Sequence, residues 1–275
     1  IGNYFASSSP IVGTSASLAQ LGSHSIQRPD GKFLVILGNA TSNTSIYDPF
    51  ASSTAGSFAP GPALSANAAE STHSIQRPDG KFLIILGNNT SNTSIYDPVA
   101  NTVVAGPSVV GTGVSNAFYG ALSIQRPDGK FLVILGKVSS NTSIYDPVAN
   151  TFTAGPAVVG TSASNASWDA HSIQRPDGKF LVVLGNATTD TSIYDPVQNA
   201  FYPGPSLGTG NSAGYGAHSF QRPDGKYLMI VGNTTATTTL YDAGWVTEGS
   251  YISEAIYNTA LDSTSALAWT GNADA

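Results

Sequence analysis

Large aromatic residues stand at one equivalent position in three successive copies of a repeated block. Tyr119, Trp168 and Tyr215 each lie three residues before the first residue of their copy. Glu70 takes the same position in an earlier copy, and Asp169 directly follows Trp168. Aromatic rings pack on the C–H faces of sugars while nearby polar groups bind the hydroxyls. These residues therefore predict a site for a glycan or peptide ligand. The alternative is that the rings only pack between repeats.

Amide side chains lie in polar loops that we expect beside these residues. In each copy an apolar stretch ends at a glycine, and a loop rich in Asn, Ser and Thr follows it. An Asn amide both donates and accepts hydrogen bonds, which suits the recognition of hydroxyl groups. We therefore add three loop residues to the candidate ligand site, namely Asn141, Asn186 and Asn233.

Catalytic chemistry has few candidates in this sequence. Glu70, Asp169 and Asp190 are the acidic residues of the repeat region that lie outside the repeated motifs. Glycoside hydrolysis needs paired carboxylates, but Glu70 and Asp169 have no recurring third polar partner. The chain has no cysteine, no Gly-x-Ser-x-Gly motif and no phosphate-binding glycine loop. We expect no enzymatic activity, with a glycosidase-like enzyme as the remaining alternative.

The four histidines of the chain occupy one equivalent position, and Leu122 takes that position in the remaining copy. Imidazole groups around an axis could bind a metal ion. The leucine interrupts the set, however, and no acidic residue recurs beside it. We therefore expect the histidines to pack against neighbouring repeats, and we predict neither a metal nor another cofactor. The histidines are His24, His73, His171 and His218.

The block that must position these residues recurs five times. It reads His-Ser-Ile-Gln-Arg-Pro-Asp-Gly-Lys-Phe-Leu-Val-Ile-Leu-Gly, followed by a polar loop and by Thr-Ser-Ile-Tyr-Asp-Pro. The copies are spaced by 49, 49, 49 and 47 residues. The chain of 275 residues has 29 Gly and 16 Pro but only three Glu, so it is poor in helix formers and rich in turn formers. This period predicts an all-β fold, a five-bladed β-propeller of four-stranded blades.

Each of the first four copies is expected to form four strands, which in the first copy span residues 24–28, 32–38, 44–47 and 57–59. The fifth copy lacks a fourth strand. The missing strand is predicted at the N-terminus, because Asn3-Tyr4-Phe5 matches Asn150-Thr151-Phe152 at an offset of 147, three repeat lengths. A strand at residues 3–7 would complete the last blade, close the ring and cover an open sheet edge.

This organisation divides the chain into two parts. Residues 1–242 are expected to form the propeller. Residues 243–275 lie outside the repeat and are expected to form a C-terminal β extension or the start of a further domain.

The repeated block resembles those of kelch and galactose-oxidase-type propellers. The residues that carry the resemblance are Gly31-Lys32 before an apolar strand, the glycine that closes that strand, and Tyr47-Asp48-Pro49 before the fourth strand. The resemblance covers residues 1–242 and implies a propeller fold. Blade number and repeat length are more weakly similar to the five-bladed animal lectins that bind amino sugars, a likeness that concerns the fold.

Charged residues are confined almost entirely to the repeated turns. Ten of the eleven basic residues belong to the Arg-Pro-Asp-Gly-Lys motif. Arg28, Asp30, Lys32, Asp48 and their equivalents are expected to form a collar of exposed ion pairs on one face, where each pair contributes little to stability. An anion site on the arginines is the alternative. The net charge of −6 argues against nucleic acid as a partner, and the chain has no apolar stretch of about 18 residues that could span a membrane.

Taken together, these features lead us to expect an extracellular or cell-surface module for recognition or adhesion, without enzymatic activity. Its partner would be a glycan or a cell-surface protein. Low Lys and Glu contents and abundant Ser, Thr and Asn favour export. The alternative is a structural subunit of a surface layer or filament that self-assembles through its terminal segments.

Overall fold

The computed structural model describes residues 10–13, 18–51, 56–111, 116–160, 165–185, 187–208, 210–232 and 236–244. In this part of the chain the regular elements are nineteen β-strands, which form five sheets. Consecutive strands pair in an antiparallel manner within each four-stranded sheet. The fold is all-β, and its five repeated sheets are the blades of a five-bladed β-propeller, as the repeat predicts. No helix that could span a membrane occurs in these residues.

Four blades have four strands each, and the described residues of the fifth form three. The first blade consists of β1 (His24–Gln27), β2 (Phe33–Ile36), β3 (Thr44–Asp48) and β4 (Ser57–Pro60). The second consists of β5 (His73–Gln76), β6 (Phe82–Ile85), β7 (Thr93–Asp97) and β8 (Thr102–Ala105). The third consists of β9 (Leu122–Gln125), β10 (Phe131–Ile134), β11 (Thr142–Asp146) and β12 (Thr151–Ala154). The fourth consists of β13 (His171–Gln174), β14 (Phe180–Val183), β15 (Thr191–Asp195) and β16 (Ala200–Pro203). The fifth consists of β17 (His218–Gln221), β18 (Tyr227–Ile230) and β19 (Thr238–Tyr241).

The Arg-Pro-Asp-Gly-Lys motif forms the turn between the first two strands of a blade. Gly31 has a φ of 80°, a left-handed conformation that glycine adopts without steric cost. Its N–H donates to the Arg28 carbonyl oxygen at 3.1 Å, and Asp30 Oδ1 accepts from the Lys32 N–H at 3.2 Å. The motif therefore specifies a tight hairpin through the left-handed conformation of its glycine and the hydrogen bond that its aspartate side chain accepts.

The hydrophobic core lies between neighbouring blades. Leu83 and Ile85 of β6 belong to one buried cluster with Val133, Leu135 and Tyr145 of the third blade. Equivalent clusters join the first blade to the second and the third to the fourth. Full burial of a Leu or Ile side chain contributes about 1.5–3 kcal/mol. Because each of the first three blades buries its central strands against the next one, these four blades stabilise one another in sequence order.

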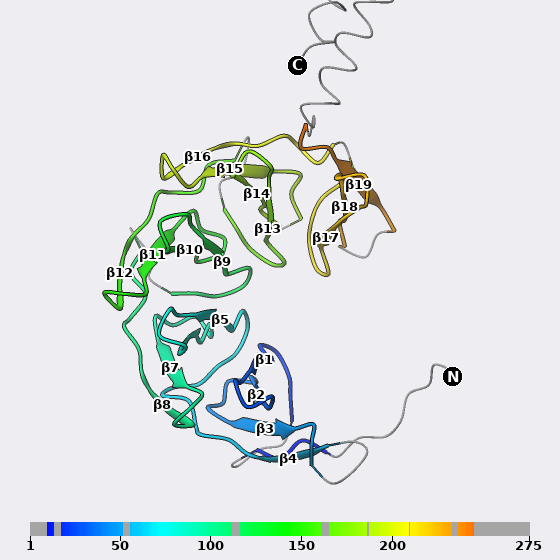
Figure 1. Ribbon diagram of the computed structural model, residues 1–275. Helices are drawn as coiled ribbons and strands as arrows, with labels where there is room; N and C mark the ends of the chain where they lie inside the picture. The colour runs from blue at the N-terminus through cyan, green and yellow to red at the C-terminus, as the bar shows by residue number, and fades with distance from the viewer. Residues whose placement is uncertain are drawn as a thin grey trace, which may run out of the picture. The chain divides into compact units, whose positions relative to one another are not determined.

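Figure 1 shows the same strand order in each of the first four blades. The first strands, β1, β5, β9 and β13, lie on the inner side, and the fourth strands, β4, β8, β12 and β16, lie on the outer side. By its contacts the chain divides into two compact units, residues 1–219 with 229–239 and residues 220–228 with 240–275. The pockets discussed below lie within the first unit.

Two predictions about the chain ends fall outside the described residues. The N-terminal strand expected at residues 3–7 belongs to residues 1–9, and the C-terminal extension is described only as far as residue 244. The closure of the last blade and the second domain therefore stay predictions.

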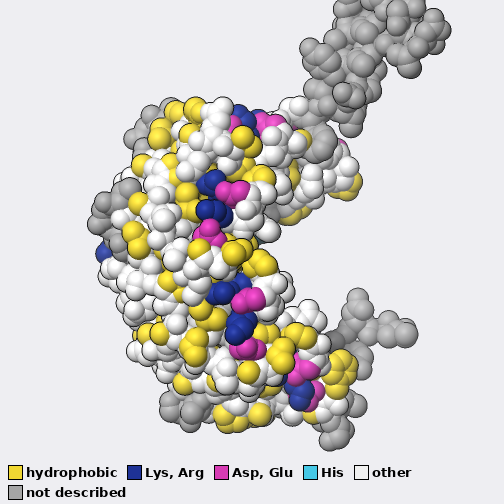
Figure 2. Space-filling view, turned by 60° about the vertical axis from the view of Figure 1, so that its left-hand side comes forward, with side chains coloured by type: hydrophobic (Ala, Val, Ile, Leu, Met, Phe, Trp, Pro, Cys, Tyr) yellow, Lys and Arg dark blue, Asp and Glu magenta, His cyan; other side chains and the backbone are white. Residues whose placement is uncertain are grey.

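The expected exposure of the charged collar is wrong for Arg28, Arg77 and Arg126, whose side chains are 10%, 11% and 10% exposed, whereas that of Arg222 is 42% exposed. Figure 2 shows basic and acidic side chains side by side in this collar. Arg77 pairs with Asp79 at 3.1 Å, but its side chain is only 11% exposed. Its Nη1 atom donates to Asn150 Oδ1 at 2.6 Å and to the Tyr145 hydroxyl at 3.1 Å. Both acceptors belong to the next blade, so the arginine lies in the interface between blades as well as in the turn.

Candidate ligand-binding site

The variable connections between blades surround a pocket of about 380 Å³, here called the aromatic pocket. Each connection that precedes the first strand of a blade contributes to its wall. The lining residues are Leu21, Gly22, Glu70, Ser71, Tyr119, Gly120, Trp168, Asp169 and Tyr215. Five predicted site residues thus meet in one place, because the repeat puts equivalent positions of successive blades side by side.

The fold positions the aromatic residues through the glycine that follows the second strand of each blade. Gly136 has a φ of 67°, and a Cβ atom there would lie 2.1 Å from the carbonyl oxygen of Tyr119. The neighbouring Lys137 N–H donates to the same oxygen at 3.0 Å. This close approach fixes the backbone of the connection. It recurs between Gly185 and Trp168 and between Gly232 and Tyr215.

The three predicted aromatic rings contact one another across the blades. The rings of Trp168 and Tyr215 stack with centroids 4.8 Å apart and planes 25° apart. Tyr119 meets Trp168 edge-on at 5.3 Å and also contacts Phe118 at 3.8 Å. Such pairs contribute about 0.5–1.5 kcal/mol beyond the area they bury. Packing between blades therefore accounts for part of their role, and the rings also form a continuous wall of the pocket.

Solvent exposure differs along this wall. Tyr215 is 59% exposed, whereas Tyr119 and Trp168 are half-buried. The Nε1 atom of Trp168 is buried without a hydrogen-bond partner in the described part of the chain. A buried polar group without a partner costs about 1–3 kcal/mol. Tyr215 is the ring that presents the largest free surface to a ligand.

Asp169 supplies an exposed carboxylate at the edge of the pocket. Its Oδ2 atom accepts a hydrogen bond from the Gly216 N–H of the next connection at 2.8 Å. Its φ of 57° is left-handed, a conformation that Asp tolerates better than most residues. Gly22 and Gly120 stand at the equivalent position with φ of 82° and 76°. Since glycine meets the demand of this turn, the turn itself does not require a carboxylate there.

Glu70 is the second carboxylate of the aromatic pocket and is half-buried. Its carbonyl oxygen accepts from the Asn88 N–H at 3.4 Å, the contact that corresponds to the one between Tyr119 and Lys137. Among the described residues, neither lysine nor arginine lines the pocket. Its chemistry is therefore that of aromatic faces, hydrogen-bond acceptors and negative charge.

The aromatic pocket, as the described residues line it, contains none of the three asparagines predicted for the site. Asn141 does not line it. Its backbone oxygen accepts from the Leu135 N–H at 3.1 Å, a bond that closes the loop after β10. Asn186 and Asn233 lie outside the described residues. The structure thus places Asn141 outside the lining of the aromatic pocket, in a loop that bonds back onto its own blade.

Sequence reasoning missed Leu21 and Ser71 as lining residues. Leu21 stands at the same repeat position as the three aromatic residues, and Ser71 stands at the position of Asp169. The register of the repeat could have identified both residues. Chemistry alone did not, since leucine and serine carry no distinctive signal for a ligand.

Two of the four histidines, His24 and His73, form the contact with a neighbouring blade that the sequence predicts, whereas His171 Nε2 is buried without a hydrogen-bond partner among the described residues. His73 Nδ1 lies 2.8 Å from the Ser71 carbonyl oxygen, and its Nε2 lies 2.8 Å from Ser123 Oγ in the next blade. Because a carbonyl oxygen can only accept, Nδ1 carries the proton and Nε2 accepts from the serine hydroxyl. Burial lowers the pKa of His73 to about 4, which keeps the ring neutral. His24 makes the same contact with Ser74 Oγ at 2.7 Å.

Comparison with known proteins gives similarity in structure but not in sequence. No protein-family model matches the chain, and no curated protein sequence matches it. A fungal alcohol oxidase of the AA5 family, solved in complex with copper, is 16% identical, with 80% of this chain and 61% of that chain covered and a TM-score of 0.46. A protein of unknown function from Dyadobacter fermentans is 11% identical, with 81% and 79% covered and a TM-score of 0.49.

The dihydro-heme d1 dehydrogenase NirN in complex with DHE is also similar. It is 16% identical, with 78% of this chain and 43% of that chain covered and a TM-score of 0.50. The chain thus spans about three fifths of the alcohol oxidase and less than half of the dehydrogenase. At these identities the likeness shows the fold alone.

The expectation of a non-enzymatic recognition or adhesion module is corrected by the structural comparison, because the dehydrogenase NirN is an enzyme with a similar fold. That expectation rests on the absence of local catalytic motifs. A propeller brings together residues from different blades, so catalytic groups need not be neighbours in sequence. No three His, Cys, Asp or Glu side chains of the described residues form a group that could hold a metal ion.

Proposed function

We propose that the aromatic pocket binds a neutral saccharide. The observation that carries this proposal is the meeting of Tyr119, Trp168 and Tyr215 with Glu70 and Asp169 in one pocket of about 380 Å³. Pockets of about 300–1,000 Å³ with aromatic walls and a few polar groups are typical of small-ligand sites.

Each group in the pocket has a role that matches a pyranose ring. The exposed ring of Tyr215 offers a flat apolar face for the C–H side of a sugar. The carboxylates of Glu70 and Asp169 accept hydrogen bonds from hydroxyl groups, and charged acceptors form the stronger bonds. Because no cation lines the pocket, a neutral sugar fits better than an acidic one.

Binding of a saccharide and its hydrolysis can be measured on the same samples. Glu70 and Asp169 are the two carboxylates of the pocket, and hydrolysis of a glycosidic bond uses a pair of carboxylates. We therefore pair each binding measurement with an analysis of the sugar after incubation. Release of shortened saccharides by the protein, and its loss in Glu70→Gln and Asp169→Asn, would assign hydrolysis to this pocket.

The first test is a glycan array probed with the labelled 275-residue chain. We expect neutral glycans to be retained, with affinity reduced in Tyr215→Ala while the fold remains intact. Phe50→Ala is the matched control, because Phe50 is also an exposed aromatic residue, at 79% exposure, but does not line the pocket. The proposal fails if no neutral glycan is retained, or if both variants weaken retention equally.

A further inference from the structure

A second type of pocket lies at the opposite end of the innermost strands. Strand β5 begins at His73, two residues after Ser71 of the aromatic pocket, and ends at Gln76. A pocket of about 480 Å³ opens there between the second and third blades. We call it, with its equivalent between the third and fourth blades, the inter-blade pockets. The first is lined by Ser74, Ile75, Gln76, Arg77, Pro78, Ser123, Gln125, Gly129 and Phe131.

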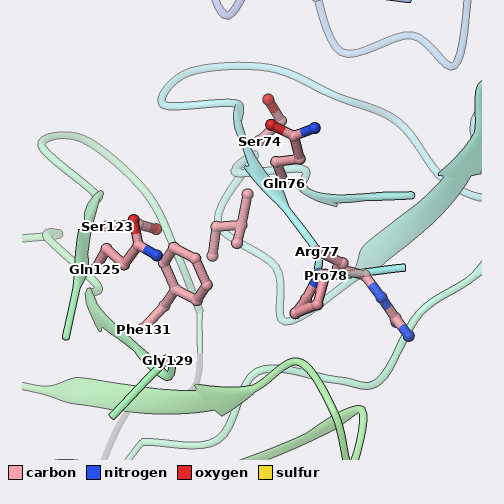
Figure 3. A pocket seen from close by; sticks show the side chains of 9 residues that line it. Ser74, Gln76, Arg77, Pro78, Ser123, Gln125, Gly129 and Phe131 are labelled. Carbon is pink, nitrogen blue, oxygen red and sulfur yellow. The ribbon is translucent and has the colours of Figure 1, made fainter. Parts of the chain in front are cut away.

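The free polar groups of this pocket are neutral amides. Gln76 and Gln125 are exposed, and their side chains have no hydrogen-bond partner within the described residues. The serine hydroxyls, in contrast, are bound to histidines of the preceding blades. Arg77 also has its partners elsewhere, and Figure 3 shows its side chain pointing away from the space between Gln76 and Phe131.

The equivalent pocket shares one wall with the first. It has a volume of about 300 Å³, and its lining includes Gln125, Gln174 and Phe180. Gln125 lines both pockets, so the two are adjacent along the inner strands. A ligand that is longer than one pocket can therefore continue past Gln125 into the next.

The fold itself does not require glutamine at these positions. Gln76 and Gln125 are exposed and form no bond to a neighbouring blade within the described residues. The last copy of the block replaces other residues, with Phe220 for Ile and Tyr227 for Phe, but keeps Gln at this position. An exposed amide that the fold does not use is available to a ligand.

We propose that the inter-blade pockets bind an uncharged, extended peptide segment. A glutamine amide has one acceptor and two donor hydrogens, which complement the C=O and N–H of a peptide backbone. An extended segment leaves those backbone groups free, whereas a helix uses them internally. Phe131 and Pro78 offer apolar surface to the side chains of the peptide. The absence of tryptophan, tyrosine and carboxylate distinguishes this lining from that of the aromatic pocket.

The test uses an array of N-acetylated, C-amidated octapeptides made of uncharged residues, probed with the 275-residue chain. Bound sequences are then measured in solution as octapeptides and as their tetrapeptide halves. We expect an octapeptide to bind about tenfold or more tightly than either half, because it reaches both pockets. Gln125→Ala should weaken octapeptide binding about tenfold and Gln76→Ala about threefold, the range for losing one or two hydrogen bonds.

The matched control is Gln27→Ala. Gln27 occupies the same position in the first blade and is also exposed, but it lines neither pocket. Trp168→Ala should also leave peptide binding unchanged, which separates this site from the proposed saccharide site. The proposal is overturned if no uncharged peptide binds, if Gln27→Ala weakens binding as much as Gln125→Ala, or if only a saccharide binds in a Gln125-dependent manner.

Discussion

At the scale of single residues, arginines in surface turns join neighbouring blades. Arg77 donates to Tyr145 and Asn150 of the next blade and pairs with Asp79 in its own turn. The sequence suggests only an exposed ion pair. The two acceptors lie 68 and 73 residues away, so no local pattern in the sequence reveals them.

We expect Arg77→Gln to lower the free energy of unfolding by about 2–3 kcal/mol, because it removes charged hydrogen bonds between blades. Arg222→Gln is the control, since the Arg222 side chain is 42% exposed and its loss should cost about 1 kcal/mol or less. Urea denaturation of both variants measures the difference. Equal and small losses would show that the inter-blade bonds of Arg77 contribute nothing.

His73 should make stability depend on pH. Its pKa is lowered to about 4 by burial, against 6.5 for the unfolded chain. The contribution of neutral His73 to folding stability is therefore complete above pH 6.5. It is lost as the pH falls toward 4, because the histidine of the unfolded chain is protonated at a higher pH than that of the folded chain. The change amounts to roughly 3 kcal/mol.

The matching variant is His73→Leu, which copies the Leu122 that the third blade already has at this position. Its free energy of unfolding should fall less than that of the unmodified chain between pH 7 and pH 4.5, although His24 and His171, whose pKa values are also lowered by burial, keep part of the dependence. Urea denaturation at the two pH values gives the comparison. Identical changes in the free energy of unfolding of both proteins would contradict the lowered pKa of His73.

At the scale of elements, the glycine after the second strand couples each blade to the connection that carries a site residue. Gly136→Ala would put a Cβ 2.1 Å from the Tyr119 carbonyl oxygen in a left-handed backbone. Gly129→Ala, in the hairpin turn, has a similar φ of 79° but no atom within 4 Å. Gly129→Ala therefore measures backbone strain alone, and Gly136→Ala measures backbone strain together with a steric clash.

We expect Gly129→Ala to cost about 1–2 kcal/mol from backbone strain alone. Gly136→Ala should cost clearly more and should also shift the near-ultraviolet circular dichroism of the aromatic cluster, because Tyr119 must move. Thermal denaturation and circular dichroism of both variants test this. A smaller loss of stability in Gly136→Ala than in Gly129→Ala would mean that the connection carrying Tyr119 moves at little energetic cost.

The elements themselves were predictable from the sequence because each strand lies in a block repeated five times. The fourth strand of the first copy, predicted at residues 57–59, is β4 at Ser57–Pro60. The gathering of Glu70, Trp168 and Tyr215 followed from the same register. The loop of Asn141 did not, because the bond from Leu135 that folds it back depends on backbone geometry that composition does not encode.

At the scale of the whole molecule, the closure of the last blade is still a prediction from the sequence. Arg175 differs from Arg77 and Arg126 in a way that agrees with it. Arg77 and Arg126 donate through Nη1 to Asn150 and Asn199 of the following blade, whereas among the described residues Arg175 bonds to Asp177 of its own turn. The offset of 147 residues makes Asn3 the counterpart of Asn150 for the last blade.

Deletion of residues 1–12 should therefore uncover the edge of the last sheet and cause aggregation, because an unpaired strand edge templates pairing with other chains. Asn3→Ala should lower the free energy of unfolding by about as much as Asn150→Ala. Light scattering and denaturation provide the measurements. A shortened chain that stays monomeric and equally stable would rule out this closure.

The most direct test of the aromatic pocket uses Trp168 as its own reporter. The chain has three tryptophans, and a variant with Trp245→Phe and Trp269→Phe keeps only Trp168. Titration with a neutral saccharide retained on the glycan array should shift or quench its emission in a saturable manner. Adding Tyr215→Ala should weaken that response by about 1–3 kcal/mol of binding free energy. Saturable saccharide binding that leaves the Trp168 emission unchanged, or no binding at all by a correctly folded protein, would contradict a saccharide site in this pocket.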